Sequence, residues 1–336
     1  MKILIAGGGY DGKQSGVINK IGEQFKHTGI CSVVNGGKLP DVSGFDLVLW
    51  MPDVSNNEEK QYPIKDTGTV LICSKVMREG YTLFDAVTRI FKMHGNAVIA
   101  IHKNPGSMFK FELVDALGHI WYTGYNIENL CRTINDLYNW TKGAIRKSIP
   151  KANDAVSGEI GSINLETFMK LNSDIALKSA AQCGNRFFGN FSTRCTKLFP
   201  SHRYRPSSMH GEVIIMSPRN TDKRTLKPDD MVAIINGAYV GSRKPSVDAP
   251  VQLQIYKEVH GINFMIHGHA YVKGMPTTDC YFPCGDMREV QETVKLLHDG
   301  HKAINLKNHG FLLATKTLEE MIQLKDSLTF EKIYSF

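Results

Sequence analysis

The sequence predicts an α/β protein with two domains, of which the first is a doubly wound, mostly parallel sheet. The chain has 336 residues, whereas a single domain usually holds about 100 to 200. Up to about residue 126, apolar strand-like runs alternate with helical patterns, which is typical of a sheet covered by helices on both faces. A polar stretch then precedes a second set of apolar runs, so we expect two separately packed cores.

The strands expected in the first domain are short apolar runs bounded by Gly, Pro, Asp or Asn. Between two of them, Leu83–Met93 has apolar residues at helical spacing, and Gly95 follows as a stop signal. A later pair of runs around Gly118 predicts a hairpin at one edge of the sheet. The alternation favours a Rossmann-like or flavodoxin-like domain over residues 1–145. Its expected parallel strands are KILIA, CSVVN, DLVLWM, TVLIC and NAVIAIH.

A glycine-rich turn follows the first of these strands. Gly7, Gly9 and Gly12 match the G-x-G-x-x-G pattern after a strand and before a helix, which is the context of a dinucleotide site. Such a site also needs an acidic residue at the end of the second strand, where this chain has Asn35. A nucleotide or phosphate pocket and a purely structural turn therefore both remain open for this domain.

Residues 146–161, RKSIPKANDAVSGEIG, predict an exposed linker because they are polar and rich in Ser, Gly and charge. The second domain is expected over residues 162–336. It begins with an amphipathic helix over residues 165–181 and ends with a helix from about Leu318 into the terminus. Strands dominate between them, and the runs that predict these strands are EVIIM, MVAIIN, FMIHGHA, KAINL and FLLAT.

Composition narrows the class of protein. Seven scattered cysteines without a C-x-x-C pair argue against a disulfide framework, and neither a secretory leader nor a membrane-length apolar run is present, so we expect a cytoplasmic protein without a membrane partner. The net charge of +7 suits nucleic acid or an anionic small molecule. Phosphate on a small molecule is favoured over nucleic acid because the basic residues cluster among the motifs described next: Arg194, Lys197, Arg203, Arg205, Arg219, Lys223, Arg224, Arg243 and Lys244.

A pattern of histidines predicts a divalent-metal site. His267 and His269 are two residues apart in a strand-like run, so their side chains point to the same face. His309 follows between two further apolar runs, with Gly310 allowing a tight bend. Three neutral imidazoles leave an open position on Zn²⁺ for substrate, as in catalytic sites. The alternative is that each histidine is a satisfied core or loop residue.

Two other segments offer groups that bind phosphate or move protons. In GNRFFGNFSTR, a glycine turn stands beside Asn190, Ser192 and Arg194, whose amide, hydroxyl and cationic groups suit phosphate. In GSRKPSVDAP, Lys244, Ser246 and Asp248 provide a cation, a hydroxyl and a carboxylate that could act as a general base. Taken singly, either segment could be an ordinary surface turn.

The order of these motifs resembles the class II aldolase and adducin-head family. The order is Gly-Asn-x-Ser-x-Arg, Lys-Pro-Ser-x-Asp, His-x-His and Asn-His-Gly, and the likeness extends over about residues 165–336. The resemblance implies an α/β/α domain around a largely antiparallel sheet. It also implies Zn²⁺, or another divalent metal, bound by His267, His269 and His309, and a homo-oligomer, commonly a tetramer.

The resemblance further implies roles for individual residues. Asn190 and Ser246 contact the substrate phosphate, and Asp248 lies at the metal in a form close to that of the pentulose-phosphate 4-epimerases. Ser217 and Arg219 stand in SPRN where relatives have Thr-Pro-Ser-Gly, so phosphate recognition is expected to change, with Arg219 as a charged partner. Candidates for a further acid-base group are Asp279, in a loop shorter than that of the epimerases, and Tyr334, which could equally be an ordinary terminal tyrosine.

We therefore expect a zinc-dependent lyase or epimerase that acts on a small phosphorylated ketose through a metal-stabilised enediolate. A sugar-phosphate dehydratase of the same family is one alternative, because aldol cleavage, epimerisation and dehydration can share this intermediate. A non-catalytic, adducin-like scaffold that binds a protein or nucleic acid is the other.

Overall fold

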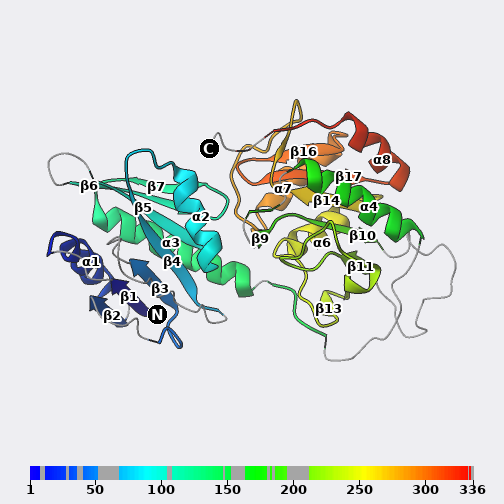
Figure 1. Cartoon of the computed structure of the whole chain (residues 1–336). Helices are drawn as coiled ribbons and strands as arrows, with labels where there is room; N and C mark the ends of the chain where they lie inside the picture. Colours follow the sequence, from blue (N-terminus) through cyan, green and yellow to red (C-terminus); the bar gives the residue numbers. More distant parts are fainter. Residues whose placement is uncertain are drawn as a thin grey trace. The chain divides into compact units, whose positions relative to one another are not determined.

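The chain forms two compact units in the computed structural model, Met1–Ile145 and Arg146–Ser335 (Figure 1). The division falls where the predicted linker begins. The structure describes residues 1–7, 12–27, 30–35, 41–51, 68–103, 108–146, 148–152, 163–179, 182–183, 186–194, 212–331 and 333.

The first unit is built on one seven-stranded sheet in the order β2-β1-β3-β4-β5-β6-β7. The first five strands are parallel, and each overlaps one of the five runs predicted from the sequence. The last two strands are antiparallel and form the expected edge hairpin. The strands are β1 (Lys2–Gly7), β2 (Ile30–Asn35), β3 (Leu47–Met51), β4 (Val70–Met77), β5 (Ala97–Lys103), β6 (Phe109–Asp115) and β7 (Ile120–Gly124).

Helices cover both faces of this sheet. Helices α1 (Gly12–Phe25) and α3 (Ile127–Arg146) pack on the face that carries Ile5 and Leu49. Helix α2 (Leu83–Met93) lies on the other face, where Arg89 stacks on Trp50. Helix α2 has the predicted bounds, although the left-handed residue that ends it is His94 rather than Gly95. Helix α3 was not among the predicted elements.

The second unit is built on an antiparallel sheet of seven strands in the order β13-β12-β11-β10-β14-β17-β16. Every neighbouring pair is antiparallel, as the family resemblance implies. The strands are β10 (Asn190–Arg194), β11 (Val213–Met216), β12 (Val232–Ile235), β13 (Ala238–Val240), β14 (Phe264–Gly268), β16 (Ala303–Leu306) and β17 (Gly310–Thr315).

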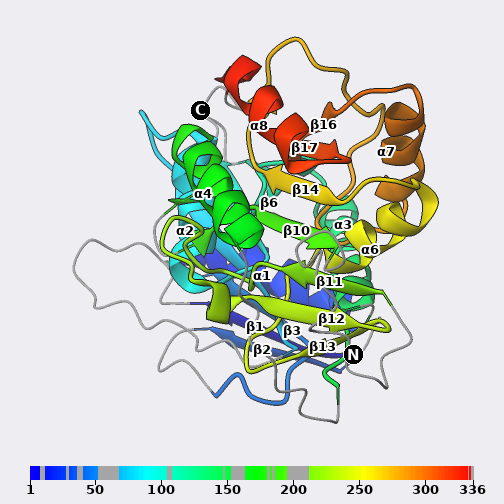
Figure 2. The same cartoon turned by 90° about the vertical axis from the view of Figure 1, so that its right-hand side faces the viewer.

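Two pairs of helices sandwich this sheet, which gives three layers (Figure 2). Helices α4 (Ile163–Lys178) and α8 (Leu318–Ser327) pack on one face. Helices α6 (Ala249–Glu258) and α7 (Glu289–His298) pack on the other. Short elements complete the described part: β8 (Gln182–Cys183), β9 (Arg186–Phe187), the 3-10 helix η2 (Pro228–Asp230), β15 (Tyr271–Val272) and β18 (Phe330–Glu331).

Four expectations about the second unit were wrong in detail. The segment read as a phosphate loop around Asn190 begins the central strand β10, and helices α6 and α7 stand where strands were expected to dominate. The last helix ends at Ser327 instead of running into the terminus. Part of the predicted linker is not exposed: Ile149 is buried, and residues 150–152 pair with Tyr239 of β13.

Two of these differences have a tertiary cause that local periodicity does not reveal. Strand β10 lies between β11 and β14 in the sheet, and residues 150–152 pair with Tyr239 of β13. Separately, none of the described helices is long and apolar enough to cross a membrane.

Candidate metal centre

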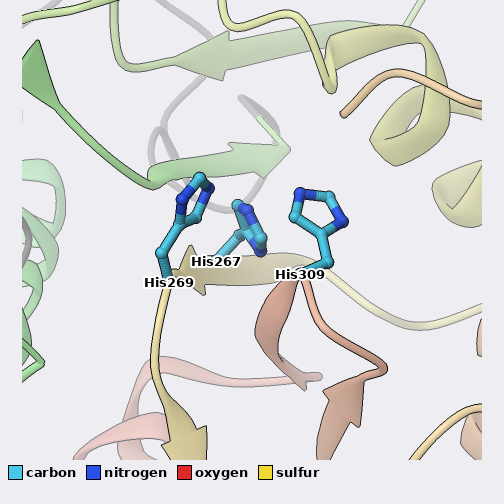
Figure 3. A group of neighbouring side chains, drawn as sticks. All are labelled: His267, His269 and His309. Atoms are coloured by element: carbon cyan, nitrogen blue, oxygen red, sulfur yellow. The ribbon is translucent and has the colours of Figure 1, made fainter. Parts of the chain in front are cut away.

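Three histidines meet at one end of the antiparallel sheet. His267 lies in β14, His269 follows that strand, and His309 directly precedes β17. The distances between their ring centroids are 4.8, 5.1 and 5.5 Å, and one ring nitrogen from each lies within 4.8 Å of the others. Figure 3 shows the three rings projecting to the same side of the strands. The structure thus brings together the three residues that the sequence predicts as ligands.

The protonation of His267 is set by its surroundings. Its Nδ1 lies 2.9 Å from the carbonyl oxygen of Phe311, and because a carbonyl can only accept, Nδ1 carries the hydrogen. Its Nε2 is buried without a hydrogen-bond partner among the described residues. Burial, followed by the nearby His309, lowers the pKa of His267 to about 4. At neutral pH the ring therefore presents a bare lone pair to the space between the histidines.

His309 is oriented by an acidic residue. Its Nδ1 donates to Oε1 of Glu289, the first residue of α7, at 3.0 Å, and both side chains are buried. Burial alone would lower the pKa of His309, but Glu289 and Cys284 raise it well above its usual value. Metal-binding histidines usually have such a carboxylate beside them. It accepts a hydrogen bond from one ring nitrogen and so directs the other ring nitrogen toward the cation.

His269 is held by stacking. Its ring lies on that of Phe188, with centroids 4.9 Å apart and planes 20° from parallel. Burial, then the neighbouring His267 and His309, lowers the pKa of His269 well below its usual value. All three imidazoles are thus positioned by separate parts of the fold, and His267 and His269 are neutral at physiological pH.

Asp248 stands beside the histidines at the N-cap position of α6. Its Oδ2 lies 3.8 Å from Nε2 of His267 and accepts from Nδ2 of Asn190 at 3.3 Å. Its Oδ1 is buried without a partner among the described residues. Asn190 is brought here because β10 pairs with β14 so that Asn190 lies opposite His267.

The glycine before Asn190 permits this close approach of two strands. Gly189 has a φ of +73°, and a Cβ on it would lie 2.4 Å from the carbonyl oxygen of His267. The Gly-Asn motif is therefore required by backbone packing at the metal centre as well as by the amide side chain.

The predicted phosphate-binding residues divide into two groups. The hydroxyl of Ser192 is fully buried between Gln252 and Tyr256, and that of Ser217 accepts from the backbone nitrogen of Phe191 inside the sheet. The other members lie nearer the histidines. Ser246 accepts from Asn190, while Arg219 and Lys244 are exposed and joined by a backbone hydrogen bond of 2.9 Å.

The remaining predicted residues are Asp279, Tyr334 and the glycines of the first unit. Asp279 is exposed, and its backbone carbonyl accepts from Lys307. Tyr334 and Gly9 lie outside the described residues. In the first unit, Gly7 ends β1 and Gly12 begins α1, which agrees with the strand-to-helix context of their motif.

Sequence reasoning missed three residues at the site. Besides Glu289, Cys284 places its Sγ 3.3 Å from Nε2 of His309. Lys223 is 5% exposed, and burial, opposed by Asp222 and Asp248, lowers its pKa to about 8. The only available signal was their proximity in the chain to recognised motifs, and this does not distinguish them from surface residues.

The donors present fit a divalent cation. Zn²⁺ binds imidazole nitrogen, thiolate sulfur and carboxylate oxygen, and all three kinds of donor converge here. A buried imidazole lone pair and a buried carboxylate oxygen, both without partners among the described residues, are costly unless something binds them.

Comparison with known proteins agrees with this geometry. Residues 180–275 match the family described as the class II aldolase and adducin N-terminal domain. The L-fuculose phosphate aldolase of Methanococcus maripaludis is 26% identical over 147 residues, with 34% of this chain and 79% of that protein covered.

Two solved structures illustrate the range of structural likeness. The L-fuculose-1-phosphate aldolase from Thermus thermophilus is 16% identical, with a TM-score of 0.34 and coverage of 49% of this chain and 90% of that chain. A DNA/pantothenate metabolism flavoprotein from Streptococcus pneumoniae is 13% identical, with a TM-score of 0.31 and coverage of 41% of this chain and 99% of that chain.

The match over residues 180–275 lies within the second unit, and the resemblance to the class II aldolase and adducin family found in the motifs is confirmed.

Proposed function

We propose that the second unit is a zinc-dependent enzyme of the aldolase type that acts on a small phosphorylated ketose. One observation supports this above the others: the unpaired, buried Nε2 of His267 faces two further imidazoles and stands beside the carboxylate of Asp248. A scaffold has no need of such a group, because an unsatisfied buried nitrogen lowers stability unless it binds a ligand. When bound, the cation would stabilise negative charge on a substrate oxygen.

Asp248 is proposed as the group that holds or moves a proton. Its Oδ2 is fixed by Asn190 and Ser246, whereas its Oδ1 has no partner among the described residues and is free to accept a proton from substrate. The carboxylate also stands at the N-cap position of α6. These contacts orient the base before substrate arrives, which reduces the entropy lost in reaching the transition state.

Lys223 and Arg219 are proposed to bind the anionic end of the substrate. The charge of Lys223 acts on both His267 and His269, so the ammonium lies near the metal centre although it is almost fully buried. Partial burial lowers the pKa of Arg219, while the neighbouring Asp248 and Cys284 oppose that effect. Burial of the Lys223 ammonium carries a desolvation cost, and a phosphate group would supply a compensating negative charge.

Epimerisation at the 4-position is the second candidate reaction. It is favoured by the aspartate in KPSVDAP, because the resemblance places an aspartate at the metal in the epimerases. Cleavage and epimerisation need the same metal and the same base, so the residues around the histidines serve either reaction.

The first test is metal analysis of the purified full chain and of two variants. We expect about one zinc ion per chain in the wild type, loss of the metal in His267→Ala, and retention in His260→Ala. His260 is a matched control because it is an exposed histidine of the same unit. A wild-type protein that binds no divalent metal would instead favour the adducin-like scaffold.

The second test is a panel of pentulose and deoxyhexulose phosphates incubated with the metal-loaded protein. Product analysis separates the reactions: cleavage yields an aldehyde and a three-carbon ketose phosphate, epimerisation yields an isomer of equal mass, and dehydration yields a product lighter by one water. No turnover of any member by a protein that holds its metal would contradict the proposal.

Two further features belong to the proposal. The resemblance implies a homo-oligomer, commonly a tetramer, which sedimentation analysis would test.

For the first unit we propose a doubly wound domain of flavodoxin-like order, since β2-β1-β3-β4-β5 is the order of that class. The end of β1 at Gly7 then lies at the point where the strand order reverses, where such sheets bind phosphate-bearing ligands. Thermal shift with a panel of nucleotides would test it.

A further inference from the structure

We propose that Cys284 is a direct ligand of the metal ion, so that the resting centre contains three imidazoles and one thiolate. The proposal rests on the proposed metal site and goes beyond it, since neither the sequence motifs nor the matched family region, which ends at residue 275, contains this cysteine.

The first support is distance. Two donors on one tetrahedral zinc ion, with Zn–N near 2.0 Å and Zn–S near 2.3 Å, lie about 3.5 Å apart. The Sγ of Cys284 lies 3.3 Å from Nε2 of His309, the ring nitrogen left for a metal once Nδ1 donates to Glu289. Nε2 of His267 and Oδ2 of Asp248 are 3.8 Å apart, which is longer than this spacing. The thiol therefore lies at the spacing of two ligands of one ion from His309, which belongs to the three-histidine group.

The second support is convergence from independent elements. Donor atoms of Asp248, Cys284 and His309 lie within 4.8 Å of one another, and the three-histidine group shares His309 with them. The Nε2 of His267 and the Oδ1 of Asp248 are buried and unpartnered among the described residues. Two groups besides the cysteine thus point to a ligand at this place.

The third support is the way in which the Cys284 segment is anchored. Gly285 has a φ of +78°, and a Cβ on it would lie 2.9 Å from the carbonyl oxygen of Val247, so this segment packs closely against the one that carries Asp248. Four residues later, Glu289 begins α7 and orients His309. The same short segment therefore positions both the thiol and the group that aligns the imidazole.

The chemistry of binding is simple. Burial, with Asp248 nearby, raises the pKa of Cys284, so the thiol is protonated without a metal. On binding, the Sγ–H bond breaks, the proton passes to solvent, and a metal–sulfur bond forms without any oxidation. A thiolate makes the site softer than three imidazoles alone, so zinc and cobalt are favoured over magnesium and manganese.

The main experiment is the absorption spectrum of the Co²⁺-loaded full chain. A thiolate bound to cobalt gives a near-ultraviolet charge-transfer band, which imidazole and carboxylate ligands do not give. We expect the band in the wild type and in Cys280→Ser, and its loss in Cys284→Ser. Cys280 is the matched control because it is an exposed cysteine four residues away in the same segment. Zinc affinity, from competition with a chelator, should fall at least about tenfold in Cys284→Ser, which is the lower end of what even an outer-shell partner contributes.

A second measurement needs no variant. Trypsin cleavage after Lys273 and Arg288 yields one peptide that contains both Cys280 and Cys284. We expect bound zinc to slow alkylation of Cys284 by iodoacetamide at least about tenfold and to leave Cys280 unchanged, with fragment ions distinguishing the two. Bound cobalt without a charge-transfer band, or equal alkylation of Cys284 with and without zinc, would overturn this inference and leave the proposed function standing. Failure of the wild type to bind either metal would overturn both.

Discussion

Replacing Lys223 by Met should make the metal-free second unit more stable at neutral pH. Lys223 is 5% exposed, and burial of its ammonium lowers the pKa from an ordinary 10.5 to about 8. Methionine keeps the unbranched apolar stem and removes the charge. The stability gained would come entirely from relieving the desolvation of a group that the fold keeps for binding.

The magnitude follows from the pKa. Each pKa unit is worth about 1.4 kcal/mol, so the lowered value corresponds to a penalty of about 3 kcal/mol when the lysine is fully protonated in both states. The unfolded chain holds the proton up to about pH 10.5, whereas the folded chain loses it above about pH 8. The penalty is therefore complete below pH 8 and disappears as the pH rises to about 10.5, and over this interval the wild type gains stability relative to Lys223→Met.

The assay is urea denaturation of the metal-free chain at pH 7 and at pH 10. Circular dichroism reports both units, whereas tryptophan fluorescence reports the first unit alone because Trp50, Trp121 and Trp140 all lie there. At pH 7 we expect Lys223→Met to shift the second unit's midpoint upward by about 1 M or more, for an ordinary dependence on urea, and the first unit's midpoint to stay unchanged.

The same substitution at the exposed Lys257 serves as the control and should shift neither midpoint. Lys223→Met should also weaken the binding of inorganic phosphate to the metal-loaded protein, because the substitution removes the ammonium group. Equal midpoints for Lys223→Met and the wild type at pH 7, or a difference that grows between pH 8 and pH 10.5, would refute the reasoning.

Three further outcomes concern the metal centre. Glu289→Gln should weaken zinc binding about 10- to 100-fold, and an unchanged affinity in a chelator titration would rule out its orienting role. Although burial opposes it, Glu289 raises the pKa of His309 well above its usual value, so zinc must displace a proton and its affinity should increase with pH. Calorimetry in buffers of different ionisation enthalpy should detect this proton release. A binding heat that is the same in every buffer would contradict the prediction. Gly310→Ala should abolish zinc binding with every ligand intact, because its Cβ would lie 2.0 Å from the carbonyl oxygen of Gly268, whereas Gly143→Ala, in open space, should not.

The parallel strands of the first unit and helix α2 could be read from the sequence because each follows a strong local periodicity. The same is true of the pair His267 and His269, since residues two apart on a strand face the same way whatever the strand packs against. His309 and Asp248 were named from their own short segments, and the order of motifs that resembles a known family joined them to this pair. In each case the information was contained in a short stretch of chain.

Helices α6 and α7 were not among the predicted elements, although their buried residues recur at helical spacing, as Val290, Val294 and Leu297 do in α7. Ser192 shows the opposite error. Its motif suggested a phosphate contact, but its hydroxyl is occupied by Gln252 and Tyr256 of α6. The role of the Ser192 side chain thus depended on which helix packs against that face of the sheet.

By itself, the sequence determined the direction in which side chains leave each strand and the presence of a histidine-rich motif. Only the tertiary structure decided that Cys284, Glu289 and Lys223 join that motif, because they come from segments whose positions depend on how α6, α7 and the loop after β11 close over the sheet. Local periodicity specifies orientation within an element, whereas the meeting of elements depends on long-range packing. The burial which that packing creates lowers the pKa values of His267, His269 and Lys223.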